Sequence, residues 1–137
     1  MTIPIATPWL LRRVNQRYRA GMAEALTAAG FDDLSQPGYW ALGGIGAGAL
    51  DASDLVTQMG ISKQAVSKLV DALVASNYLE RRENEADRRR TNLVLTERGQ
   101  RAAAMISKSV AKTEAAMAKE LGAEGLAEFR RLLGLVS

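Results

Sequence analysis

ISKQAVSKLVDALVASNYLERRENEADRRRTNLVLTERGQ, residues 61–100, carries the most informative pattern in this 137-residue chain. Its first part places apolar residues at helical spacing: Ile61, Ala65, Val66, Leu69, Val70 and Leu73. This periodicity predicts a helix over about 62–76 that buries these residues, with Ser62 as its N-cap. The opposite face is small, polar and basic: Lys63, Gln64, Ser67, Lys68 and Asp71.

Two strand-like runs follow this helix, at residues 78–82 and 91–95. Leu93 and Leu95 alternate toward a core, and the polar segment between the runs is too long for a two-residue turn. We therefore predict a β-hairpin with a long loop. The loop carries the basic run 88–90, and Asp87 can pair with a neighbouring arginine and fix its direction.

Outside this stretch the pattern predicts helices. An amphipathic helix runs from Pro8 to Ala29, and a short second helix begins with Ser35 as its cap. Asp51 is expected to cap a third helix, which ends at the turn 60–62 and buries Leu55, Val56 and Met59 on its inner face. Thr96 is expected to cap a long helix over 97–120, followed by a last helix over 123–135.

The segment GGIGAG, residues 43–48, follows the start of the second helix. Glycine is a poor helix former, so we expect it to weaken the end of that helix. A phosphate-binding loop is disfavoured, because the segment lacks a following Lys-Ser/Thr and does not open a helix after a strand.

Composition excludes several chemistries. The chain has no Cys and no His, which removes disulfides, thiol redox switches, Cys or His metal sites and histidine-dependent catalysis. No paired acidic motif suggests a metal, we expect no cofactor, and the chain is too short for the cofactor domain of a methyltransferase. We therefore expect no enzyme. The chain has no membrane-length apolar run and a poor signal peptide, so we expect a cytoplasmic protein.

A helix-turn-helix followed by a β-hairpin defines a winged helix-turn-helix, in a fold that is mainly α with a small β-hairpin wing. Residues 62–101 hold nine Lys and Arg against six Asp and Glu, which accounts for the whole net charge of +3. A local basic surface suggests a nucleic-acid partner. The polar helix face fits a major groove, and arginine fits a narrow minor groove.

Residues 61–100 resemble the MarR/SlyA family of bacterial transcription regulators. The resemblance rests on the wing signature Asp-x-Arg at Asp87 and Arg89 and on the LTERG start of the next helix, at residues 95–99. The flanking helices match in order and length, so the resemblance extends over the whole chain. The glycines of 43–48 depart from the family pattern, which has a more ordinary helix end there.

The resemblance implies a homodimer whose N- and C-terminal helices, in residues 1–34 and 97–137, interlock between subunits. Residues 35–96 would form the winged DNA-binding lobe of a single domain, 1–137. The implied function is repression of promoters with palindromic operators, relieved by a small aromatic or anionic effector. The implied DNA-contacting residues are Ser62, Lys63, Gln64, Ser67, Lys68, Arg88, Arg89 and Arg90, with Arg89 in the minor groove and the flanking arginines left between phosphate and solvent.

Two alternatives stay open at the level of sequence. The winged helix could serve only protein contact, or it could bind DNA without sequence preference as an architectural module. The aromatic residues of the first two helices are more simply packing residues than effector contacts. If an effector does bind there, its candidate contacts are Trp9, Arg13, Arg17, Tyr18 and Trp40.

Overall fold

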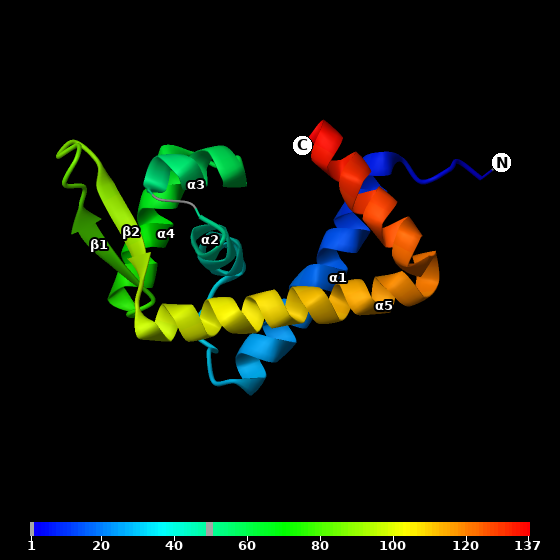
Figure 1. Ribbon diagram of the computed structural model, residues 1–137, viewed down its shortest axis with the longest axis horizontal. Coiled ribbons are helices and arrows are strands. Elements are labelled where there is room, and N and C mark those ends of the chain that lie inside the picture. The colour runs from blue at the N-terminus through cyan, green and yellow to red at the C-terminus, as the bar shows by residue number, and fades with distance from the viewer. Residues whose placement is uncertain (1, 49–50) are drawn as a thin grey trace.

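The computed structural model describes residues 2–48 and 51–137. Its order is α1 (Thr7–Ala28), α2 (Gln36–Gly46), α3 (Ala52–Met59), α4 (Lys63–Ala75), β1 (Leu79–Glu83), β2 (Thr91–Leu95) and α5 (Glu97–Val136). Figure 1 shows α3, α4 and the hairpin grouped at one end, with α5 running from that group toward the two termini. The expected mainly α fold with a small antiparallel hairpin is confirmed.

All four expected caps form, which explains why the helices begin where they do. The side chains of Ser35, Asp51, Ser62 and Thr96 accept hydrogen bonds from the backbone N–H three residues later. Each cap satisfies an N–H that has no partner within its helix. Gly60 ends α3 with φ 65°, a left-handed conformation that glycine adopts at little cost.

The core gathers under the winged lobe, where α2, α3, α4 and α5 meet. Leu42, Leu55, Val66 and Tyr78 are fully buried there. The last two expected helices appear as α5, whose non-helical Gly122 separates the long segment from the returning C-terminal segment. Figure 1 shows this last segment turning back toward the N-terminal end of α1.

Two local expectations were imprecise. Ala65 is exposed, because the buried face of α4 is centred on Val66, Leu69 and Val70. The glycine-rich segment continues α2 as far as Gly46, so it does not break the helix early. The helical glycines also let α2 pack close to its neighbours: a Cβ at Gly44 would lie 2.9 Å from Oε1 of Gln58.

One cluster joins the winged lobe to the start of α5. The Arg98 guanidinium lies 4.1 Å from the ring centroid of Tyr78 and donates to both carboxylate oxygens of Asp33 over 3.2 Å. It also donates to the Ser76 carbonyl, and the Tyr78 hydroxyl donates to Asp33. The α1–α2 loop, the end of α4 and the first turn of α5 are thereby held together.

Candidate nucleic-acid interface

The recognition surface begins with the exposed face of α4. Ser62, Lys63, Gln64, Ser67 and Lys68 are all exposed, and the opposite face of the helix is buried against the core. The Ser62 hydroxyl is already engaged, since it accepts from the Ala65 N–H over 3.1 Å. The structure therefore presents four free polar side chains from the N-terminal turns of this helix.

The wing supplies the second part of the surface. β1 and β2 pair in antiparallel register from Leu79 opposite Leu95 to Glu83 opposite Thr91. The hairpin extends beside α4 (Figure 1). An ion pair between Arg81 and Asp71 ties β1 to the helix. The wing and the polar face of α4 thus form one continuous candidate surface.

The loop at the tip of the wing is organised by two polar side chains. Oδ1 of Asn84 accepts from the N–H groups of Ala86 and Asp87 over 2.9 and 3.0 Å. Oδ1 of Asp87 accepts from the Arg89 N–H over 3.1 Å and from its Nε over 3.4 Å. The expected pairing of Asp87 with a neighbouring arginine is therefore present, and its partner is Arg89.

The three wing arginines have different environments. The Arg89 side chain is 93% exposed and Arg88 is 89% exposed, with only Glu83 at 3.9 Å beside the Arg88 Nε. Arg90 instead turns back and forms an ion pair with the buried carboxylate of Asp51. Two arginines therefore face solvent, and the third is engaged by the protein.

A cleft lies between α1, α2, the α3–α4 turn and α5. Its volume is about 680 Å³. Apolar side chains and the glycines of α2 form most of the wall: Met22, Tyr39, Trp40, Gly43, Gly44, Met59, Ile61, Ile106 and Val110. Among the described lining residues Arg19 carries the charge, and its Nη1 donates to Oε1 of Gln36 over 3.1 Å.

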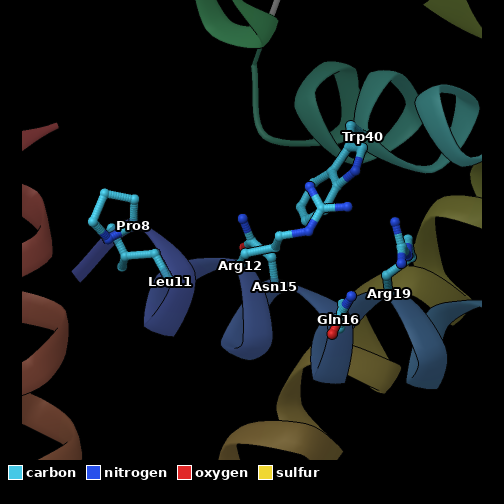
Figure 2. Close-up of a pocket in the computed structure, with 7 residues that line it drawn as sticks. All are labelled: Pro8, Leu11, Arg12, Asn15, Gln16, Arg19 and Trp40. Carbon is cyan, nitrogen blue, oxygen red and sulfur yellow. The ribbon is translucent and has the colours of Figure 1, made fainter. Parts of the chain in front are cut away.

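An adjoining hollow of about 440 Å³ shares Asn15, Arg19 and Trp40 with this cleft. Figure 2 shows Arg12, Asn15 and Arg19 projecting from α1 toward the part of α2 that bears Trp40. Sequence reasoning missed Arg12, Asn15 and Arg19, although Arg12 and Arg19 stand on the basic face of the helix.

The five expected effector contacts do not come together. Trp40 lines the cleft, but Trp9 and Arg13 line a shallow hollow against the N-terminal segment. Arg17 pairs with Glu120 on α5 over 2.9 Å, and the Tyr18 hydroxyl donates to Glu114 over 3.2 Å. These two side chains therefore brace α1 against α5.

Two other kinds of functional feature are absent from the described residues, 2–48 and 51–137. None of their helices has the length and apolar character that a membrane span needs. No group of three or more His, Cys, Asp and Glu residues in this part of the chain could hold a metal ion.

The fold and the exposed surface together define a winged helix-turn-helix of the DNA-binding class. The model of the MarR family matches residues 32–90, from the α1–α2 loop to the end of the wing loop. Over these residues the chain is similar to the MarR family of transcription regulators.

Solved structures with the same fold extend over nearly the whole chain. The reduced form of MarR from E. coli matches with a TM-score of 0.75 and 23% identity, covering 98% of each chain. A mutant of E. coli MarR complexed with operator DNA matches with a TM-score of 0.73 and 24% identity, covering 94% of this chain and 91% of that one. Bordetella bronchiseptica BpsR, whose DNA binding is regulated by 6-hydroxynicotinic acid, matches with a TM-score of 0.73 and 19% identity. The match covers 99% of this chain and 96% of that one. The search of curated proteins found no match.

Proposed function

We propose that the protein is a homodimeric, sequence-specific repressor that occupies palindromic operators in double-stranded DNA. The observation that carries the proposal is the continuous surface of α4 and the wing. Gln64 and Lys68 have free polar ends on an exposed helix face, and Arg89 extends from the wing with 93% of its side chain exposed. Gln and Lys suit base edges and phosphates in a major groove, and Arg suits a minor groove.

Substitution of Arg89 tests this proposal. Arg89→Ala should weaken operator binding by about tenfold or more, because an arginine that reads DNA contributes about 1–3 kcal/mol. Arg101→Ala is the control, since Arg101 is an exposed arginine on α5 away from the wing. Equal affinities of both variants for the same duplex, at one salt concentration, would contradict a DNA-reading wing.

The dimer is proposed from apolar side chains left exposed at the two ends of the chain. They lie in the first turns of α1 and in the last segment of α5: Trp9, Leu10, Leu11, Leu132, Leu135 and Val136. Exposed apolar groups gathered in this way mark an interaction site. Their position fits dimerisation through residues 1–34 and 97–137, with residues 35–96 as the DNA-binding lobe of one domain.

Oligomeric state can be measured by sedimentation equilibrium. Leu135→Asp should shift the protein from dimer toward monomer, because the Leu135 side chain would enter the interface, while the helical content should stay unchanged. A dimer as stable as the wild type would place the interface elsewhere. A two-fold dimer would set its α4 helices about 34 Å apart for successive major grooves.

The cleft is the proposed effector site, and its chemistry suits a small aromatic anion. Trp40 and Tyr39 offer apolar and aromatic surface, and Arg19 supplies the positive charge. Regulation of BpsR by 6-hydroxynicotinic acid is a precedent in a protein of the same fold. The effector would release DNA only by its higher affinity for a dimer whose α4 spacing no longer fits.

This site can be tested by screening a panel of aromatic carboxylates for binding and then measuring the affinity of any ligand found by calorimetry. Arg19→Gln should weaken binding of any ligand found, whereas Arg13→Gln, outside the cleft, should not. Equal loss in both variants would move the site away from Arg19.

A further inference from the structure

Arg90 is the one wing arginine whose charge is neutralised by a buried partner. Its Nε donates to Oδ2 of Asp51 over 2.9 Å, and its Nη2 donates to the same oxygen. The Asp51 side chain is only 8% exposed, whereas the Arg90 side chain retains 49% exposure. A buried carboxylate needs such a partner, because an unpaired charge in that position is costly.

Asp51 is also the point where the wing meets the helix-turn-helix. Its Oδ1 caps α3 by accepting from the Asp54 N–H over 2.9 Å, and its backbone forms an isolated antiparallel bridge to Asn92 of β2. The Asp54 N–H above all, and then Arg90, hold the pKa of Asp51 below its ordinary value against the opposing effect of burial. The carboxylate is therefore ionised at neutral pH and available to both partners.

The backbone of Arg90 closes the wing loop. Its N–H donates to the Asp87 carbonyl over 3.0 Å, and its carbonyl accepts from the Asn84 N–H over 3.2 Å. Because Asp87 in turn holds the backbone and side chain of Arg89, a continuous set of contacts runs from Asp51 to Arg89. Arg88, with one weak neighbour at 3.9 Å, takes no part in it.

We propose that Arg90 is a positioning residue: through Asp51 it fixes the wing loop to the start of α3 and so sets the direction of Arg89. The inference rests on the proposed DNA binding and differs from the sequence-based interpretation, which left Arg90 open between phosphate contact and solvent. Fixing the loop in the free protein lowers the ordering cost at binding, so that more of the contact energy of Arg89 appears as affinity.

Asp51→Asn separates positioning from contact. Asparagine still caps α3 but removes the charge that holds Arg90. If the released loop presents Arg89 correctly in about a fifth of molecules, the apparent Kd should rise about fivefold. Unchanged or tighter binding by Asp51→Asn would overturn the proposal, because a freed Arg90 would then be gaining contacts with DNA.

A double-mutant cycle sharpens the result. Arg90→Gln should weaken binding in the wild-type background but add little in an Arg89→Ala background, since its effect passes through Arg89. Full additivity would indicate an independent DNA contact and overturn the proposal. Arg88→Gln is the matched control in the same loop with the same charge change, and its effect should add to that of Arg89→Ala.

Hydrogen exchange gives a readout without DNA. The amides of residues 87–90 should exchange faster in Asp51→Asn and Arg90→Gln than in wild type, whereas Arg88→Gln should match wild type. Unchanged amide exchange in both Asp51→Asn and Arg90→Gln would overturn the proposal. If the wild type binds no duplex at all, the proposed function fails, and hydrogen exchange still decides separately whether Arg90 holds the loop.

Discussion

Gly99→Ala tests whether the joint between the wing and α5 is as tight as the structure shows. Gly99 is buried in the first turn of α5, where an added Cβ would overlap the carbonyl oxygen of Tyr78 and lie 3.0 Å from its carbonyl carbon. That oxygen is backbone and accepts from the Thr96 N–H over 3.1 Å. Relief of the overlap requires the backbone itself to move.

The cost follows from what that movement breaks. The N–H of Gly99 donates to Oγ1 of Thr96 over 3.0 Å, and that hydroxyl donates to the Asn77 carbonyl over 2.6 Å. Forcing a methyl into a packed site costs about 1–3 kcal/mol. Each weakened hydrogen bond adds about 1 kcal/mol. We therefore expect a loss of about 3 kcal/mol or more, a large share of a typical domain's stability of about 5–15 kcal/mol.

Chemical denaturation at fixed protein concentration measures this loss. Gly43→Ala is the control, because its Cβ would meet Cγ2 of Ile106 at an ordinary 3.7 Å within the helix α2. That change should be neutral or stabilise by up to about 1 kcal/mol, since alanine is the better helix former. If Gly99→Ala were as stable as Gly43→Ala, the contact between Gly99 and the Tyr78 carbonyl would have room for a methyl group after all.

Three further predictions concern the same lobe. Burial, and then the contact with Asp33, raise the pKa of Tyr78 to about 12, above its unfolded value of about 10. The free energy of unfolding should therefore keep the full contribution of neutral Tyr78 below about pH 10 and fall between about pH 10 and 12, and Tyr78→Phe should lack this fall. Parallel pH profiles of the two proteins, measured by denaturant titration, would count against this prediction. Ser62→Ala should lower the unfolding free energy by about 1 kcal/mol through loss of the α4 cap, and an unchanged midpoint would mean that water replaces it. Lys68→Ala should reduce the salt dependence of DNA affinity by about one unit of slope, and a wild-type slope would show that Lys68 makes no phosphate contact.

The sequence alone was sufficient to predict features that depend on residues a few positions apart. Ser35, Asp51, Ser62 and Thr96 were identified as caps because a cap acts on an N–H three residues away. The pairing of Asp87 with Arg89 is local for the same reason. The alternation of buried and exposed residues along α4 also placed its polar face outward, apart from Ala65 at the edge.

Long-range partners could not be read from the sequence. Arg90 was indistinguishable from its two neighbours, because its partner Asp51 lies 39 residues earlier in the chain. Arg17 and Tyr18 were candidates for the effector site and Arg19 was not, although all three stand on α1. Only the packing of α1 shows that Arg17 and Tyr18 pair with α5 and that Arg19 faces the cleft.

Selection from random duplexes measures whether the protein recognises a specific DNA sequence. The wild-type protein would be incubated with a random pool in the presence of competitor DNA, and the bound duplexes would be sequenced. We expect enrichment of a palindrome whose half-sites lie about one helical turn apart, bound about a thousandfold or more tighter than unrelated DNA. Equal recovery of all sequences would contradict sequence-specific recognition by α4 and the wing.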